Sequence, residues 1–179
     1  MAKLSWREWA TDPEQLRRLQ LLEKVSLFAG LSRRHLGKLL VKLFEKEYDP
    51  GETIFLEGEP GKALFIVLDG KVSISRADDG GEQRFATLAP GAYFGELALI
   101  DDLPRSATAR ADEHSALLIL YKSHFEELIE GHSTIAIRVM GNLLKALTGY
   151  VRSAHFRMAS HTVTPAASAA APERSRRPA

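Results

Sequence analysis

Apolar residues in the first 47 positions recur at helical spacing, which predicts two helices. The first helix is predicted to begin at Asp12-Pro13-Glu14. Asp is a good N-cap, Pro suits the first turn, and an acid there lies at the positive end of the helix dipole. Gly30 ends this segment, and Ser32 is placed to cap a second helix. The apolar faces consist of Leu16, Leu19 and Leu22 in the first helix and Leu36, Leu39, Leu40 and Leu43 in the second.

Between residues 48 and 121 the pattern changes to short runs rich in β-branched and aromatic residues. Turn signals separate these runs, and Asp69-Gly70, between two apolar runs, is typical of the tight turn of a β-hairpin. Many short strands with frequent turns predict a sandwich, jelly roll or barrel and argue against alternating βαβ units. The expected strands lie at residues 53–56, 63–68, 71–75, 85–88, 106–109 and 116–120.

Helical spacing returns between residues 122 and 158, with a break at Gly131 and a new helix from about Ser133. Apolar residues of this last helix alternate at intervals of three and four, the pattern of a coiled-coil seam. The seam would span about 31 Å at the usual helical rise, which is long for one small barrel, so we expect it to pair two chains. The alternative is a helix packed on its own barrel. The seam residues are Ile137, Met140, Leu144, Leu147, Val151, Ala154 and Met158.

Composition excludes several classes of protein. The 179 residues include 24 Lys and Arg against 23 Asp and Glu, a balance that argues against a surface coated with basic residues for nucleic acid. The absence of Cys excludes disulfide scaffolds, thiolate nucleophiles and iron–sulfur clusters. No window has the roughly 18–20 apolar residues of a membrane helix, and no signal-peptide core is present, so we expect a soluble cytoplasmic protein without a membrane segment.

No sequence pattern of an enzyme stands out. The six His residues lack ligand spacing with a third donor, so we expect no metal site. A Walker loop, a dinucleotide fingerprint and a nucleophile elbow are all missing from the sequence. We therefore expect a protein that is not an enzyme and has no cofactor.

The stretch Phe94–Ala109, FGELALIDDLPRSATA, carries the chemistry. Gly95 can take a positive φ or allow another group close to the backbone. Glu96–Leu99 is a short helical run whose first amides lack internal partners, and such amides attract phosphate. Arg105 offers a planar fork of donors to two phosphate oxygens, and Glu96 can accept a hydrogen bond from a ribose hydroxyl. The pattern suits a small ribose phosphate; an ordinary ion pair of Glu96 with Arg105 across a surface loop is the alternative.

This stretch resembles the phosphate-binding cassette of cyclic nucleotide-binding domains. Such domains occur in protein kinase A regulatory subunits, catabolite activator-type regulators and cyclic-nucleotide-gated channels. The family pattern is Gly-Glu-Leu-Ala-Leu, a short spacer, and Pro-Arg followed by Ser, Ala or Thr and then Ala-Thr. It is filled at every position, and the resemblance covers roughly residues 25–155. It implies an α+β fold, mainly β: a double-stranded β-helix (jelly-roll) barrel flanked by N-terminal and C-terminal helices. We expect residues 1–24 to form an N-terminal helical extension, 25–158 the cyclic nucleotide-binding domain, and 159–179 a disordered tail.

The resemblance implies roles for individual residues at the phosphate and ribose. Glu96 is expected to accept a hydrogen bond from the ribose 2′-hydroxyl, and Arg105 to pair with the exocyclic phosphate oxygens. Gly95 is expected to keep the backbone close to the ribose. The remaining parts of the phosphate cradle are the backbone amides of Leu97 and Ala98, together with Ser106.

On the base side, the resemblance implies that Ile74 and Phe85 line the pocket and that the last helix supplies a lid, which we assign to Tyr150 or its neighbours. A role of Tyr150 in the core or an interface is the alternative. Ser106 serves cAMP or cGMP in relatives, and bacterial-type relatives with Arg-Ser mostly favour cAMP. The expected ligand is therefore cAMP, with cGMP as the alternative.

The predicted function is a sensor that couples binding of a cyclic nucleotide to helix rearrangement. Its expected partners are the nucleotide and a second copy of the chain, bound through the C-terminal helix. The residues after Met158 are too few for the DNA-binding helix-turn-helix domain of activator-type relatives, so no direct DNA binding is expected. The alternatives are a dimerisation or docking platform that binds no nucleotide, and a sensor of another ligand such as a cyclic dinucleotide.

Overall fold

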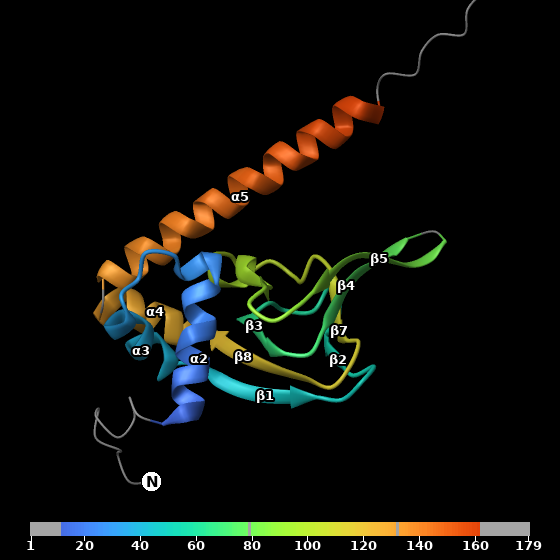
Figure 1. Ribbon diagram of the computed structural model, residues 1–179. Helices are drawn as coiled ribbons and strands as arrows, with labels where there is room; N and C mark the ends of the chain where they lie inside the picture. Colours follow the sequence, from blue (N-terminus) through green and yellow to red (C-terminus); the bar gives the residue numbers. More distant parts are fainter. Residues whose placement is uncertain (1–11, 79, 132, 162–179) are drawn as a thin grey trace, which may run out of the picture. The chain divides into compact units, whose positions relative to one another are not determined.

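The computed structural model describes residues 12–78, 80–131 and 133–161 of the chain (Figure 1). The chain divides into two compact units, residues 1–144 and 145–179. Within the described residues, the first unit contains eight strands with helices before and after them. The described part of the second unit is the C-terminal portion of the last helix.

The eight strands form two four-stranded antiparallel sheets, ordered β1-β8-β3-β6 and β2-β7-β4-β5. Neighbours in each sheet are mostly distant in sequence because the chain crosses repeatedly from one sheet to the other, as in a jelly roll. This confirms the expected fold class. The strands are β1 (Phe44–Tyr48), β2 (Thr53–Phe55), β3 (Ala63–Asp69), β4 (Val72–Asp78), β5 (Gly81–Leu88), β6 (Tyr93–Phe94), β7 (Thr108–Ala111) and β8 (Ser115–Tyr121).

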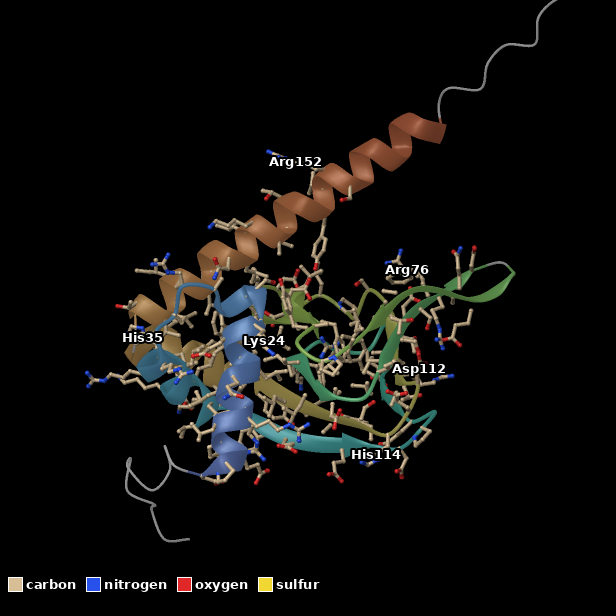
Figure 2. The ribbon with its side chains drawn as sticks, viewed as in Figure 1. Lys24, His35, Arg76, Asp112, His114 and Arg152 are labelled. Atoms are coloured by element: carbon tan, nitrogen blue, oxygen red, sulfur yellow. The ribbon has the colours of Figure 1, made fainter. Side chains whose placement is uncertain are left out.

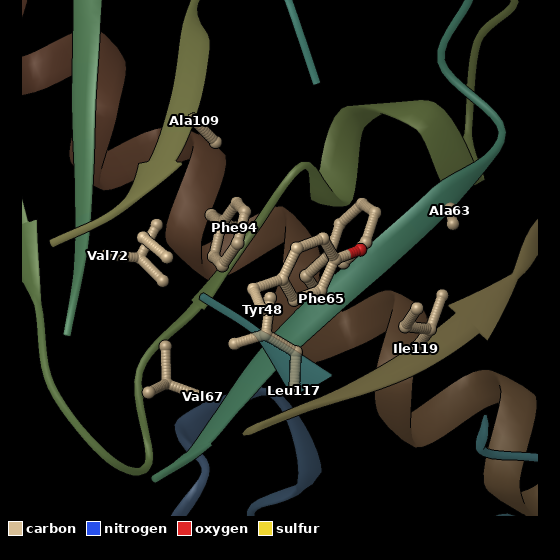
Figure 3. Packing of buried hydrophobic residues seen from close by; sticks show 10 residues of the cluster. Tyr48, Ala63, Phe65, Val67, Val72, Phe94, Ala109, Leu117 and Ile119 are labelled. Atoms are coloured by element: carbon tan, nitrogen blue, oxygen red, sulfur yellow. The ribbon is translucent and has the colours of Figure 1, made fainter. Parts of the chain in front are cut away.

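An aromatic and aliphatic core lies between the sheets (Figure 3). The rings of Phe65 and Phe94 stack with centroids 5.3 Å apart, and Phe55 packs against both. Apolar contact of this kind is the main favourable term in folding, so the rings anchor the strands that carry them. The buried cluster comprises Tyr48, Ala63, Phe65, Val67, Val72, Phe94, Ala109, Ala111, Leu117 and Ile119.

Helices cover the outer face of the sheet β1-β8-β3-β6 (Figure 1), where Leu64, Ile66, Leu118 and Leu120 are almost completely buried. Because both faces of β3 are covered, its sequence is continuously apolar rather than alternating. The elements outside the sheets are α2 (Pro13–Lys24), η1 (Ser26–Phe28), α3 (Arg33–Leu40), η2 (Glu96–Leu99), α4 (Lys122–Gly131) and α5 (Ser133–His161).

Predicted caps and apolar faces hold the N-terminal helices. Asp12 accepts a hydrogen bond from the Glu14 amide at 3.0 Å, and Ser32 caps α3 as expected. Leu19 and Leu22 are buried, whereas Leu16 is 37% exposed, so the apolar face of α2 is shorter than predicted.

The first part of α5 packs in the same unit as these helices. Ile135, Ala136, Val139 and Leu143 are buried there. The Asn142 side-chain amide donates to two backbone carbonyls of the η1 segment, of Leu27 and Ala29, both at 2.9 Å. These bonds hold the first part of α5 against η1.

The expectation that residues 1–47 are helical is wrong at its C-terminal end. Helix α3 ends at Leu40, Leu43 lies outside any helix or strand, and Phe44–Tyr48 form β1. Phe44 pairs with Ile119 and Tyr48 with Ser115 of β8, a strand far along the chain. Pairing with a distant strand overrides the local helical spacing of the leucines.

Asp69-Gly70 is a tight turn but not a hairpin, which corrects a second expectation. β3 and β4 belong to different sheets, so this turn carries the chain from one sheet to the other. Gly70 has φ +83°, and a Cβ there would lie 2.3 Å from Oγ of Ser115 and 2.4 Å from the carbonyl oxygen of His114. A positive φ and close packing of the neighbouring turn both require glycine. The strand expected at residues 106–109 is also displaced, because β7 spans Thr108–Ala111.

The described part of the second unit continues α5 as one helix to His161. No helix among the described residues combines the length and apolarity needed to cross a bilayer. The expectations for residues 1–11 and 162–179, including the disordered tail, lie outside the described residues.

Candidate functional site

The cassette begins at Gly95, between strand β6 and helix η2. Gly95 has φ +72°, in the left-handed region, and caps the N-terminus of η2. A Cβ at this position would lie 2.6 Å from Nη1 of Arg105 and 3.2 Å from the carbonyl oxygen of Ala63. Glycine is therefore required by the backbone conformation and by the approach of the arginine.

Arg105 is buried, with 9% of its surface exposed. Nη1 donates to the Gly95 carbonyl at 3.2 Å, and Nη2 donates to the Ala63 carbonyl at 2.9 Å. The guanidinium carbon lies 4.1 Å from the centroid of the Phe55 ring and 5.5 Å from that of Phe65. Nε is buried without a hydrogen-bond partner.

The electrostatics of Arg105 follow from this burial. Desolvation lowers the pKa of Arg105, while the negative charges of Glu59 and Glu96 act in the opposite direction. An arginine remains charged even so. The site thus holds a partly desolvated cation with a donor available, an arrangement that attracts an anion with several acceptor oxygens.

Glu96 is also buried, with 7% of its surface exposed, at the first position of η2. Burial is the main cause that raises the pKa of the Tyr93 hydroxyl, and the negative charge of Glu96 acts in the same direction. The same charge opposes the lowering of the Arg105 pKa by burial. Glu96 and Arg105 are therefore near one another and both withdrawn from solvent. Their burial differs from what an exposed surface-loop ion pair would show, and their role toward a ligand stays a prediction.

Two backbone bonds fix Arg105 from the other side. Its amide donates to the Glu59 carbonyl at 2.8 Å, and its carbonyl accepts from the Gly58 amide at 2.9 Å. Next to this short ladder Gly61 packs on η2, where a Cβ would lie 2.9 Å from the Cβ of Ala98. The β2–β3 loop thereby supports both ends of the cassette.

The other predicted cradle residues surround the cassette. The Ala98 amide donates to the Gly95 carbonyl at 3.3 Å, so it is already partly engaged. Leu97 is 37% exposed, and Ser106 is exposed. The first amides of η2 have no partners within the helix, as at any helix N-terminus.

The predicted base-side residues lie on adjoining strands. Ile74 of β4 packs against the core and pairs with Ala109 of β7 and Ala86 of β5. The register shift between Ile74 and Ser75 leaves Phe85 without a paired residue, and Phe85 is 60% exposed. Tyr150 belongs to the second unit, so its role remains a prediction from the sequence.

Sequence reasoning missed several residues that hold the cassette. The Phe55 ring lies under the Arg105 guanidinium, although only its apolar character was visible in the sequence. Lys122, the first residue of α4, donates to Asp102 Oδ1 at 2.7 Å and to the Asp101 carbonyl at 3.4 Å. The hydrogen bond to Asp102 is the main cause that raises the pKa of Lys122. No signal in the sequence pairs these residues, because they meet only in the folded barrel.

A surface pocket of about 410 Å³ lies beside this Lys122–Asp102 contact. Its walls carry charges of both signs and include none of the predicted nucleotide-binding residues. Within the described residues, no group of acids and histidines is arranged to hold a metal ion. The pocket is lined by Pro60, Gly61, Lys62, Asp102, Tyr121, Lys122, Ser123 and Glu126.

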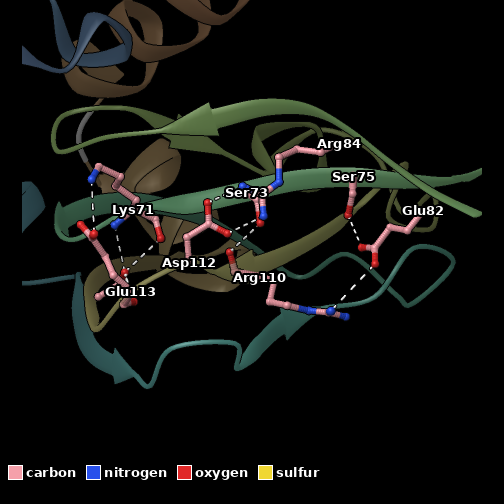
Figure 4. A network of polar contacts seen from close by, with 9 residues as sticks. Lys71, Ser73, Ser75, Glu82, Arg84, Arg110, Asp112 and Glu113 are labelled. Atoms are coloured by element: carbon pink, nitrogen blue, oxygen red, sulfur yellow. Dashed lines mark hydrogen bonds and ion pairs between the residues drawn. The ribbon is translucent and has the colours of Figure 1, made fainter.

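The outer face of the sheet β2-β7-β4-β5 carries a separate polar network (Figure 4). Arg84 binds both carboxylate oxygens of Asp112 at 2.8 Å, and Glu82 contacts Ser75 and Arg110. The charged side chains of this network are paired with one another. Its members therefore stabilise the face of the sheet rather than offer a site for a ligand.

The fold and the buried arginine define a class of protein: a jelly-roll domain with a candidate anion site between β6 and β7. The sequence model of the family described as cyclic nucleotide-binding domain matches residues 45–132. The chain belongs to this family.

Individual relatives agree with this assignment. The chain is similar to the cyclic AMP receptor protein of Thermus thermophilus, with 36% identity over 122 residues, covering 68% of this chain and 56% of the relative. The chain thus spans about half the length of that curated relative. The N-terminal domain of a transcriptional regulator from Streptomyces coelicolor superposes with a TM-score of 0.68 at 30% identity, covering 73% of this chain and 94% of that one. A cyclic nucleotide-binding domain from Methylobacillus flagellatus gives a TM-score of 0.72 at 25% identity, with 84% and 85% of the two chains covered.

Proposed function

We propose that this chain is a regulatory module that binds a cyclic nucleotide, with cAMP as the ligand, and that it acts by binding rather than by catalysis. The observation that carries the proposal is the state of Arg105. Its guanidinium is 9% exposed, rests on an aromatic ring, and keeps a buried Nε without a partner. A buried donor without an acceptor is costly, and a phosphate oxygen would supply both the acceptor and the opposite charge.

The predicted roles of the cassette residues form part of the proposal. Arg105 pairs with the exocyclic phosphate oxygens, and Glu96 accepts a hydrogen bond from the ribose 2′-hydroxyl. Gly95 admits the ribose close to the backbone. The amides of Leu97 and Ala98, with Ser106, complete the cradle. Their places around η2 support this assignment, with Leu97 and Ser106 open to solvent.

The base is proposed to lie against Ile74 and Phe85. The exposure of Phe85, 60%, supports this, because an aromatic ring at a bulge can gain contact area by covering a base. Ser106, and a relative named for cyclic AMP, favour cAMP over cGMP. The same site makes cGMP and a cyclic dinucleotide the competing ligands in the test below.

Transmission of the signal is proposed to run through the helices. Lys122 ties α4 to the cassette loop through Asp102, so a ligand that shifts the loop also shifts the start of α4. A ligand can bias the helices only as far as it binds one arrangement more tightly than the other. DNA binding by this chain is not part of the proposal.

The proposal includes a homodimer formed through α5. Ile137 is 72% exposed and Leu144 61%, while a different set of α5 residues is buried in the first unit. This observation supports a free apolar stripe rather than a stripe used for packing on the barrel. A platform that dimerises without binding nucleotide is the second candidate function, because the same exposed residues favour it.

Titration calorimetry with cAMP, cGMP and cyclic di-GMP tests the proposal. Wild type should bind cAMP with a single site per chain. Arg105→Ala should lose roughly 2–5 kcal/mol of binding free energy, or about 30-fold to several thousand-fold in affinity. Arg105→Lys should recover little, because an ammonium cannot make the two-pronged contact.

Arg17→Ala is the matched control, since Arg17 is an exposed arginine that contacts Asp69 on the surface, and it should bind as wild type does. Thermal melts of the ligand-free variants show whether a variant that does not bind cAMP is still folded. Equal cAMP affinity of wild type and a folded Arg105→Ala would contradict the proposed site. If none of the three ligands produced heat of binding, the dimerisation platform would be the remaining candidate function.

A further inference from the structure

The Ser106 carbonyl accepts two hydrogen bonds from one side chain, Arg76 of β4. Nε donates at 3.0 Å and Nη2 at 2.7 Å. Arg76 lies directly after the last β4–β7 pair, Ser75 with Thr108, where β4 continues beside β5 alone (Figure 2). Beyond the end of the backbone ladder, this side chain makes the connection between β4 and the segment that follows Arg105.

Glu57 orients Arg76. One carboxylate oxygen of Glu57 lies 3.6 Å from Nε of Arg76, and the other accepts the Ala77 amide at 3.1 Å. The Glu57 amide donates to Oγ1 of Thr108 at 3.0 Å. These contacts hold Arg76 between the turn that follows β2 and the segment that precedes β7. The side chains of Arg76 and Glu57 are 56% and 35% exposed, so the ion pair adds little energy and its effect is on direction.

Hydrogen bonds hold the peptide groups on both sides of the Ser106 Cα. The peptide group between Arg105 and Ser106 is planar, and its carbonyl is already fixed by the Gly58 amide at 2.9 Å. The next peptide group is fixed at its own carbonyl by Arg76. With both flanking planes held, the Ser106 amide and the direction of its side chain are set before any ligand arrives. Placement of contacting groups to within a fraction of an ångström decides how well a site binds.

We propose that Arg76 is a positioning residue of the phosphate site, which orients Ser106 through its carbonyl and does not touch the ligand. This rests on the proposed function, in which Ser106 contacts the phosphate. The role requires arginine, because two N–H groups of a planar fork converge on one carbonyl while the same group faces Glu57. A lysine would keep the charge but lose the fork.

The test compares Arg76→Gln and Arg76→Lys with a matched control, Arg84→Gln. Arg84 lies on the neighbouring strand β5, is 57% exposed, and also makes two hydrogen bonds, but to Asp112 on the outer face. Both Gln variants therefore remove one positive charge and one two-bond contact of similar exposure. Calorimetry with cAMP measures affinity, and melts of the ligand-free proteins report stability.

Arg76→Gln should lower cAMP affinity about tenfold, the scale of one charge-assisted hydrogen bond, while Arg84→Gln should lower it less than about twofold. Arg76→Lys should lie between wild type and Arg76→Gln. In ¹⁵N spectra, the shift of the Ser106 amide on adding cAMP should shrink in Arg76→Gln and persist in Arg84→Gln. A purely structural role would lower the melting temperature without this selective loss at Ser106.

Two results would overturn the role of Arg76 but not the proposed function. In the first, Arg76→Gln binds cAMP as wild type does while Arg105→Ala does not. In the second, Arg76→Lys binds cAMP as well as wild type. The second would show that charge at a distance is sufficient. An unchanged Ser106 shift in a weakened Arg76→Gln would also overturn it, because Arg76 would then act by another route. Failure of wild type to bind any cyclic nucleotide would instead overturn the proposed function.

Discussion

The guanidinium carbon of Arg105 lies 4.1 Å from the centroid of the Phe55 ring, and Phe55 packs on Phe65 and Phe94 of the core. The cation of the candidate site is therefore supported by the rings that fill the barrel. A desolvated cation over an aromatic ring is stabilised by about 2 kcal/mol. Arg105 is held in one orientation before ligand binds, which lowers the ordering cost of binding.

Glu96→Gln should weaken binding of cAMP much more than binding of 2′-deoxy-cAMP. If Glu96 accepts from the ribose 2′-hydroxyl, the ribose ligand loses a charge-assisted hydrogen bond of about 1.5–3 kcal/mol, whereas the deoxy ligand has none to lose. Calorimetry on two proteins and two ligands gives the pairwise coupling directly. Equal losses for both ligands would place Glu96 in a structural role, such as supporting η2.

Gly70→Ala should destabilise the fold more than Gly51→Ala. Both glycines have φ near +80°, so both variants suffer strain of about 1–2 kcal/mol from the left-handed conformation. Only at Gly70 would the added Cβ overlap other atoms, 2.3 Å from Oγ of Ser115, whereas nothing lies within 4 Å of a Cβ at Gly51. The clash should add about 1–3 kcal/mol, measured by urea unfolding. Equal losses would mean that the β3–β4 turn relaxes freely.

Tyr48 should make the protein less stable in strongly alkaline solution. Burial, assisted by the negative charge of Glu52, raises the pKa of Tyr48 to about 12, from the ordinary value of about 10. The folded state favours the protonated form of Tyr48. The resulting contribution to the free energy of unfolding is fully present below pH 10 and is lost as the pH rises to 12. The loss amounts to roughly 2–3 kcal/mol.

Urea unfolding of wild type and Tyr48→Phe between pH 8 and 12 isolates this effect from other titrating groups. The difference between the two free energies of unfolding should be constant up to about pH 10 and then change in favour of Tyr48→Phe. A difference that stays constant to pH 12 would show that Tyr48 can ionise in the folded protein.

Leu144→Glu should give monomers if two chains pair through α5. Leu144 is 61% exposed, and a charge there would be buried at an apolar contact in the dimer. Lys145→Glu is the control, since this neighbouring exposed residue should change the association energy by under about 1 kcal/mol. Sedimentation at tens of micromolar protein measures the oligomeric state of wild type and both variants. A wild type that is monomeric with and without nucleotide would contradict the dimer.

Predictions that rest on short windows of sequence agree well with the structure. Asp12 and Ser32 cap their helices, Gly95 adopts a positive φ, and the last helix is continuous from Ser133. Capping, turn conformation and helical spacing depend on residues a few positions apart, so the sequence states them directly. Glu96 and Arg105, assigned to one ligand from their motif, are both buried, and their shared role toward that ligand stays a prediction.

Local patterns in the chain were sufficient to predict the strand-rich centre, the helical ends and the motif from Gly95 to Arg105. Strand pairing and the path of the chain between the sheets depended on contacts between distant segments. Phe44–Tyr48 became a strand because β8 was available to pair with it, and Asp69-Gly70 became a corner because β3 and β4 joined different sheets. The bonds from Arg76 to Ser106 join residues thirty positions apart in the chain. Strand register, burial of charge and such long-range contacts arise only when distant segments pack together, so no local pattern contains them.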